Sequence, residues 1–127
     1  MSKEAPSSNT ESKNAFDLEE RTAIFGENVI RFEKTIPHSA VTVPLISQIV
    51  RSGTSVGANY CEADDASSKK DFKQKIGICR KESKECKHWL RMVGAAAPEL
   101  KDDARRLWQE AKELNLIFGA IRRNSDK

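Results

Sequence analysis

The chain is poor in helix-breaking residues and has no long apolar run. Its 127 residues include only four prolines and six glycines, and aromatic residues make up 6%. No apolar run approaches the roughly 18 residues that cross a bilayer, and the start of the chain, Met1 to Pro6, lacks the apolar core of a signal peptide. These absences predict a helical, single-domain protein of the cytoplasm with no membrane partner.

Cysteine is also scarce, and its three positions do not form a disulfide framework. Cys79 and Cys86 lie seven residues apart, about 10.5 Å along a helix, which is too far for a shared metal. Both fall on an apolar helix face, so we expect small buried hydrophobic residues. Cys61 lies away from such a face and is the candidate for the most reactive thiol.

Apolar residues recurring at intervals of three and four predict four helices, over residues 18–36, 42–66, 69–96 and 100–123. Pro37 and Pro98 mark turns, and Thr42 and Ser68 are the expected N-caps of the second and third helices. Short links between long helices favour an all-α, antiparallel up-down-up-down four-helix bundle. We expect a disordered tail over 1–15, the bundle over 16–124 and a short C-terminal tail over 125–127.

The segment from Arg51 to Ala63 combines poor helix formers with a helical pattern. Its two glycines alone would cost an isolated helix about 2 kcal/mol relative to alanine. Small or apolar residues nevertheless recur at heptad spacing through it, so we expect a buried helix stabilised by packing. Gly53 and Gly57, one turn apart, would then let another backbone approach closely. No Gly-Lys-Ser/Thr follows the glycines, which argues against a phosphate-binding loop.

Arg51 to Ala63 occurs together with four other short runs, Phe16 to Thr22, Lys69 to Phe72, Cys79 to Glu82 and Trp89 to Arg91. In these runs the chain resembles the bacterial "four helix bundle protein" family, also described as 23S rRNA-intervening sequence proteins. Some members are encoded within intervening sequences of large-subunit rRNA genes, and the family is related to accessory proteins of diversity-generating retroelements. The resemblance implies a ring-like homopentamer and an association with RNA, a ribosome or a reverse transcriptase. It implies no established catalytic residues.

Basic charge is concentrated on the third predicted helix. Residues 69–91 include nine basic and three acidic residues, a balance of +6 in a chain whose net charge is +3. Five of the cations share one side of the helix along about 27 Å. Such a line matches a phosphate backbone, although charged rows are more often plain solvated surface. The candidate nucleic-acid-binding residues are Lys73, Arg80, Lys84, Lys87 and Arg91. Because no aromatic residue interleaves them on this helix, we expect backbone contacts without base stacking.

Apolar residues also occur outside the four core stripes. A bundle helix needs one apolar stripe, so the surplus predicts either a broad internal contact or a subunit interface. The candidate interface residues are Ile78, Trp89, Met92 and Trp108.

Polar residues near core positions predict a buried polar network of Arg51, Asn59, Glu62 and Glu82, since an unpaired buried polar group costs about 1–3 kcal/mol. An alternative is that Glu62 and Glu82 form an acid/base pair or, with His88, a metal site. No Glu-x-x-His motif accompanies them, and the network is the preferred interpretation.

These features predict a non-enzymatic homo-oligomer, a pentamer if the resemblance holds, that acts as a scaffold with RNA or a ribonucleoprotein as its partner. A protein–protein adaptor for an enzyme such as a reverse transcriptase is the alternative. We expect no cofactor, metal or small-molecule substrate.

Overall fold

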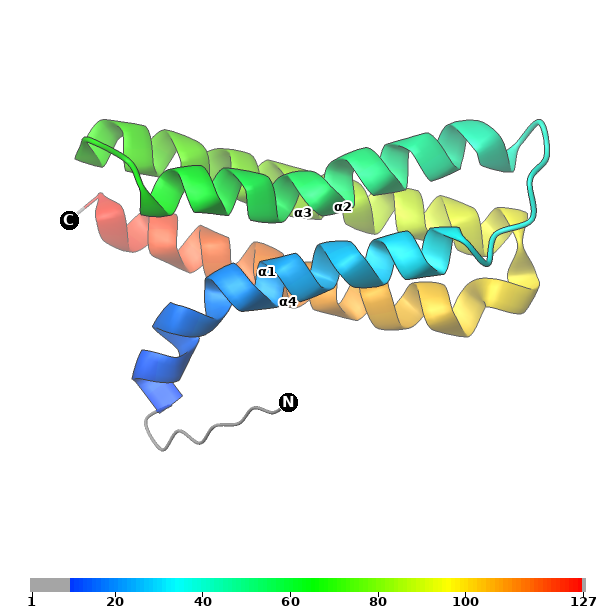
Figure 1. The fold of residues 1–127 in the computed structure, drawn as a ribbon, viewed down its shortest axis with the longest axis horizontal. Coiled ribbons are helices and arrows are strands. Elements are labelled where there is room, and N and C mark those ends of the chain that lie inside the picture. Colours follow the sequence, from blue (N-terminus) through cyan, green and yellow to red (C-terminus); the bar gives the residue numbers. More distant parts are fainter. Residues whose placement is uncertain (1–9, 127) are drawn as a thin grey trace.

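Four long helices follow one another along the chain. The computed structural model describes the backbone of residues 10–126 and the side chains of residues 18–126. The helices are α1 (Thr10–Glu33), α2 (Thr42–Asp64), α3 (Lys69–Ala96) and α4 (Lys101–Ser125), and a short 3₁₀ turn, η1 (Pro98–Leu100), precedes α4. Consecutive helices run antiparallel, with the α1–α2 and α3–α4 links at one end of the bundle and the α2–α3 link at the other (Figure 1). This confirms the predicted up-down-up-down four-helix bundle.

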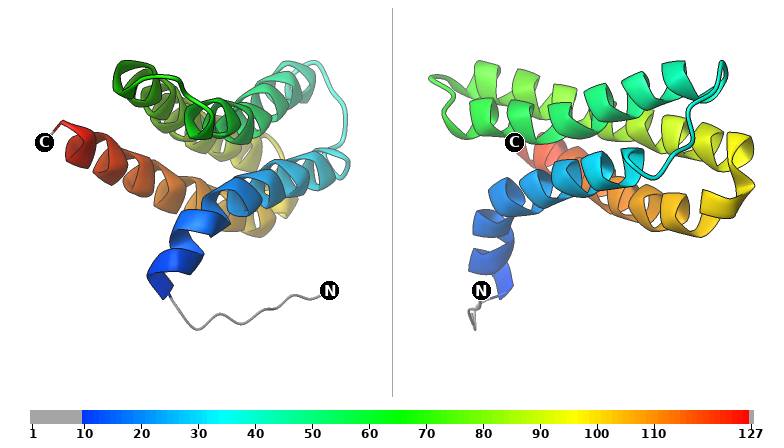
Figure 2. Two further views of the ribbon diagram at one scale, coloured as in Figure 1. Left: turned by 60° about the vertical axis from the view of Figure 1, so that its left-hand side comes forward. Right: turned by 45° about the vertical axis from the view of Figure 1, so that its right-hand side comes forward.

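The N-terminal boundary differs from the prediction. Residues 10–15, expected in a disordered tail, form the first turns of α1, and residues 1–9 lie outside the described part of the chain. These turns lead away from the other three helices (Figures 1 and 2). They carry no apolar stripe, so periodicity could not predict them. They also contain no glycine or proline, and extending an existing helix adds one hydrogen bond for each residue that becomes ordered.

The other boundaries lie close to the predictions. The third helix matches residues 69–96, whereas α1 ends three residues earlier than predicted, at Glu33. Two tighter turns follow it, in which Thr35 N donates to Phe32 O and Ile36 N donates to Glu33 O. Pro37 disfavours the helical conformation of the residue before it, so the chain leaves the helix ahead of the proline. At the C-terminus, Ser125 still belongs to α4, and Lys127 lies outside the described residues.

One predicted N-cap is confirmed and the other is wrong. Ser68 Oγ accepts a hydrogen bond from Asp71 N at 3.0 Å, as expected for the start of α3. At the start of α2, the capping oxygen is Ser39 Oγ, which accepts from Thr42 N at 3.0 Å. Thr42 Oγ1 instead donates to Pro37 O at 2.6 Å. The Thr42 hydroxyl therefore connects the start of α2 to the preceding link, and the Ser39 hydroxyl caps the helix.

The predicted apolar stripes form one continuous core. Residues from all four helices are fully or almost fully buried, and the largest are Phe25, Ile49, Ile76, Leu90, Leu114 and Phe118. Two polar side chains, Ser52 and Ser83, are completely buried among them. Their hydroxyls donate to carbonyl oxygens of their own helices, Gln48 O and Arg80 O, so neither is left unpaired.

The contact between α1 and α2 is built on glycine. A Cβ atom on Gly53 would lie 2.9 Å from Cγ2 of the buried Val29, and one on Gly57 would lie 3.3 Å from Thr22 O. Gly26 of α1 faces the same region, since its Cβ would lie 3.6 Å from Gly53 O. The segment from Arg51 to Ala63 is thus a packed helix, and the predicted close backbone approach is confirmed.

The contact between α1 and α4 is sparser than the other contacts between neighbouring helices. A groove of about 500 Å³ lies between them, lined by apolar side chains that include Ile24, Phe32 and Leu107. Charged groups also connect the two helices, since Arg21 Nε donates to Glu110 Oε2 at 2.7 Å and Arg21 Nη2 donates to Glu113 Oε1 at 2.9 Å. The fourth side of the bundle is therefore held partly by ion pairs. Within residues 10–126, no helix is long and apolar enough to cross a membrane.

Candidate nucleic-acid interface

The charged side chains of α3 divide between its two neighbours. Glu82 and Glu85 point toward α2, where both accept hydrogen bonds from Arg51. The line of predicted binding residues borders α4 instead, and Asn115 of α4 donates to the carbonyl oxygen of Arg80 at 2.8 Å. The predicted binding residues of α3 therefore lie on a different side of the helix from this acidic pair.

Lys73 is the one member of the predicted line that has a carboxylate partner. It forms an ion pair with Asp126 at the end of α4, and this hydrogen bond, with the charge of Lys73, lowers the pKa of the Asp126 carboxyl. Arg80, Lys84, Lys87 and Arg91 pair with no carboxylate among residues 18–126. Four of the five predicted cations are thus available to an external anion.

The helix α4 supplies a second row of cations beside the first. Lys101, Arg105 and Lys112 are spaced by four and seven residues, which places them on one side of α4. At the other end of the helix, Arg123 and Arg80 converge above Gly119, where an added Cβ would lie 3.4 Å from Arg123 Nη1 and 3.6 Å from Arg80 Nε. We call this surface the basic face; it comprises Arg80, Lys84, Lys87 and Arg91 of α3 with Lys101, Arg105, Lys112 and Arg123 of α4.

An aromatic ring lies within the basic face. The Nζ atoms of Lys87 and Lys112 lie 5.4 and 5.6 Å from the centre of the Trp108 ring, within the range of cation–π contacts. The expectation that no aromatic residue accompanies the cations holds along α3 alone. In the folded chain, α4 brings Trp108 beside them.

Beside Trp108, the last turns of α3 and the first turns of α4 enclose a groove of about 470 Å³. Its charged lining consists of Arg91, Lys101 and Arg105, and no carboxylate lines it. Small residues complete it, namely Gly94, Ala95 and Ala104. The small side chains leave space between the tryptophan ring and the three cations.

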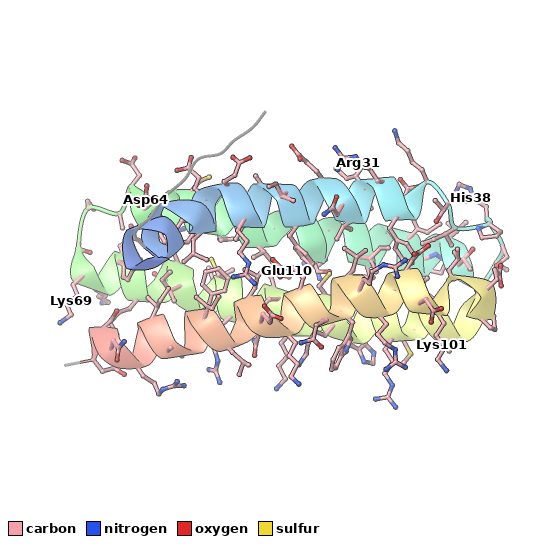
Figure 3. The ribbon with its side chains drawn as sticks, turned by 90° about the horizontal axis from the view of Figure 1, so that it is seen from below. Arg31, His38, Asp64, Lys69, Lys101 and Glu110 are labelled. Carbon is pink, nitrogen blue, oxygen red and sulfur yellow. The ribbon has the colours of Figure 1, made fainter. Side chains whose placement is uncertain are left out.

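Three carboxylates of α4 lie on the side that faces α1. Glu110 and Glu113 both bond to Arg21, and Glu110 lies between the two helices in Figure 3. Asp103 pairs with Arg106, and both line the α1–α4 groove. Side chains that end in nitrogen project along the edge of the molecule where α3 and α4 overlap in the same view (Figure 3). These carboxylates therefore lie on the α1 side of the helix together with Arg106, away from the cations of the basic face.

The predicted interface residues are all half-buried within the single chain. Trp89 and Trp108 pack against the core, and Ile78 and Met92 are partly covered. Trp89 Nε1 is buried without a hydrogen-bond partner in the described residues, and the Trp89 ring meets the His88 ring edge-on at 4.9 Å. The surplus apolar surface predicted from these residues is thus taken up in part by the bundle itself.

Other apolar side chains are more exposed. The large ones, with exposed fractions from 39% to 62%, are Ile24, Ile30, Val41, Val43 and Leu116. Ile24 and Ile30 lie on α1, and the two valines lie at the start of α2. They did not stand out in the sequence because they belong to no long stripe.

The predicted buried polar network does not form. Arg51 is exposed and pairs with Glu82 and Glu85, while Glu62 is exposed and pairs with Lys75 at 2.7 Å. Burial lowers the pKa of Arg51, but the bonds and charge of the two carboxylates outweigh it and the net pKa is raised. Asn59 Nδ2 donates to Ser55 O within its own helix. Asn59 thus bonds within its own helix and Glu62 pairs with Lys75, whereas Arg51 and Glu82 pair with each other at the surface.

The two glutamates considered as an acid/base pair or a metal site have separate ion-pair partners. Glu62 and Glu82 pair with different cations, and no group of three potential metal ligands converges within the described residues. Burial raises the pKa of the Cys79 and Cys86 thiols to about 12, whereas Cys61 is exposed. The cysteine assignments made from the sequence are confirmed as far as burial is concerned.

Comparison with known proteins places this bundle in a family. Residues 14–120 match the family described as 23S rRNA-intervening sequence protein. The chain therefore belongs to that family, as its sequence resemblance indicated. The fold is also similar to a crystal structure of a protein of unknown function from the S23 ribosomal protein family of Bacteroides thetaiotaomicron VPI-5482. The two chains share 27% identity with a TM-score of 0.75, over 83% of this chain and 97% of the other. No curated protein matches the chain.

Proposed function

We propose that the chain is a non-enzymatic, homo-oligomeric scaffold that binds RNA through the basic face. The observation that supports this most strongly is the segregation of charge: eight cations from two helices share one surface, and none of them pairs with a carboxylate of residues 18–126. A solvated helix face kept soluble by charge usually mixes both signs, as on the α1 side of α4. A phosphate backbone is the partner that such a surface suits. The cytoplasm, the compartment expected from the sequence, contains such a partner.

Binding to a fluorescently labelled, unstructured RNA oligonucleotide tests the proposal. Lys84→Glu/Lys87→Glu should lower affinity at least tenfold at low salt, since it replaces two attractions with two repulsions. Arg31→Glu/Lys34→Glu changes the net charge by the same amount at the end of α1 and in the turn after it, and should have a much smaller effect. Equal losses in the two variants would show that net charge, rather than this face, determines binding, and no binding by the wild type at about 50 mM salt would refute the proposal.

Self-association is supported by the exposed apolar residues of α1 and the α1–α4 groove. Light scattering at micromolar concentration should give a mass several times the 14.2 kDa of one chain. Because the Ile24 side chain is 44% exposed in the single chain, Ile24→Glu should weaken assembly without unfolding the bundle. A monomeric wild type would contradict this part of the proposal, and the pentamer implied by the family resemblance would be excluded by any other discrete mass.

The α1–α4 groove also favours a second candidate, a protein–protein adaptor for another enzyme such as a reverse transcriptase. Its apolar lining, with Arg31 and Arg106 nearby, has the character of a surface that receives an amphipathic helix. Under this alternative, Ile24→Glu abolishes partner binding while the Lys84→Glu/Lys87→Glu variant retains it.

A further inference from the structure

We propose that the groove beside Trp108 binds one nucleotide of a single-stranded nucleic acid, with its base stacked on the Trp108 ring and its flanking phosphates on Arg91, Lys101 and Arg105. This inference rests on the proposed function, and it adds a specific subsite to a surface that otherwise attracts phosphate without regard to the bases. The sequence did not predict it, because Trp108 and Arg91 lie on different helices.

The lining of the groove provides both contacts that a nucleotide needs. Trp108 forms one wall, and the cations come from the ends of two helices, Arg91 from α3 and Lys101 and Arg105 from α4. The volume of about 470 Å³ falls within the range of about 300–1,000 Å³ found for small-ligand sites. With three positive charges and no lining carboxylate, the groove is selective for anions.

The surroundings of Trp108 suit a base better than a second copy of this protein. Lysine ammonium groups approach its ring at 5.4 and 5.6 Å, and their desolvation would oppose the burial of this ring in an apolar interface. A stacked base would take the place of a lysine over the ring, and the displaced ammonium group would remain in water and close to phosphates. We therefore assign Trp108 to the basic face, whereas the sequence indicated an oligomer interface.

The stacking contact requires an unpaired base. In a duplex the bases are stacked on one another, and the ring of Trp108 could reach one only after its extrusion. Stacking on aromatic rings tolerates all bases, since each has a π face. The site should therefore prefer single strands over duplexes, with little sequence specificity.

Fluorescence titration of the full chain tests the inference. In a Trp89→Phe background, Trp108 is the only tryptophan of the chain. An oligoadenylate should quench its emission, and an abasic oligonucleotide of the same length and charge should bind without quenching it. Trp108→Ala should weaken oligoadenylate binding by about 5- to 150-fold, the range expected for one stacked base, and Trp108→Phe should restore most of the loss.

Trp108 also packs against the core, so Trp108→Ala could lose binding because the fold is destabilised. A second variant tests the groove without changing Trp108. Ala95 is exposed and lines the groove, so Ala95→Leu should fill the space and reduce oligoadenylate binding while leaving every cation in place. If the wild type binds both oligonucleotides equally and Trp108→Ala changes neither affinity, the stacking site is refuted while the basic face stands. If neither oligonucleotide binds at low salt, both proposals fail. A lower oligomer mass for Trp108→Ala would overturn the reassignment of this residue.

Discussion

The α1–α2 contact and the basic face of α3 and α4 differ in the size of their side chains and in what those side chains contact. At the α1–α2 contact, glycines have no side chain, so the two backbones approach each other closely. On the basic face, long cationic side chains border a groove formed by small residues, and their charges are left without carboxylate partners. The first region stabilises the fold. The second region contains cations without carboxylate partners among residues 18–126, and a surface that binds an anionic partner requires such groups.

The largest expected difference between the two regions is the effect on stability of adding a methyl group at a glycine. Gly53→Ala places a Cβ atom 2.9 Å from the buried, β-branched Val29, and overpacking of this kind costs about 1–3 kcal/mol. Gly94→Ala makes the same change beside the basic groove, where the nearest atom would be 3.8 Å away, and should stabilise the helix by up to about 1 kcal/mol. Chemical denaturation measures both. Equal effects would mean that Gly53 does not face α1.

Raising the pH above 9 should destabilise the fold, because two of its thiols are buried in the core. The Cys79 and Cys86 thiols have a pKa of about 12 when folded and about 9 when unfolded, so above pH 9 the unfolded chain binds fewer protons and stability falls as pH rises. Between pH 9 and 10 the two thiols together should cost at most about 2 kcal/mol. The free energy of unfolding of Cys79→Val/Cys86→Val should depend less on pH; an identical dependence would contradict the burial of the thiols.

The ion pairs between α1 and α4 should contribute less than the packing of α1 on α2. Arg21 bonds to Glu110 and Glu113 across the sparse side of the bundle, and these bonds raise its pKa above the ordinary value although burial opposes them. Arg21→Met should cost about 1 kcal/mol at low salt and less at high salt. Arg31→Met removes an exposed arginine from the same helix and serves as the control, with an expected change near zero.

Thiol labelling should distinguish the exposed cysteine from the two buried cysteines without changing stability. In the native protein, a water-soluble disulfide reagent should modify Cys61 alone, since Cys79 and Cys86 are buried and protonated. In denaturant, all three cysteines should react. Rapid labelling of two or more thiols in the native state would show that the core opens readily.

The features predicted correctly from the sequence are those that depend on residues within a single helix. The stripe from Leu18 to Ile36 and the start of α3 at Ser68 follow from local spacing and capping, and even the glycines of α2 could be assigned to a close contact. Helical propensity would have pointed the other way for that segment, but packing against α1 decided its structure.

The candidate site was predicted only in part, because it depends on which helices are neighbours. The sequence identified the cations of α3 but not Lys101, Arg105 and Lys112, although their spacing on α4 was visible. The pairing of Lys73 with Asp126 could not be foreseen, since the two residues are 53 positions apart and meet only where α3 begins and α4 ends. The buried network failed because Asn59 bonds within α2 and Glu62 pairs with Lys75, while the one predicted pair that forms, Arg51 with Glu82, lies at the surface.

The central claim is that the unpaired cations of the basic face bind phosphates. The salt dependence of RNA binding tests this claim most directly. For a single strand, each phosphate contact contributes about −0.7 to the slope of log affinity against log salt. Neutralising Lys84, Lys87 and Arg91 to Gln should therefore make the slope less steep by about 2, whereas Arg31→Gln/Lys34→Gln should leave it unchanged. A slope that is the same for the wild type and both variants would contradict the account.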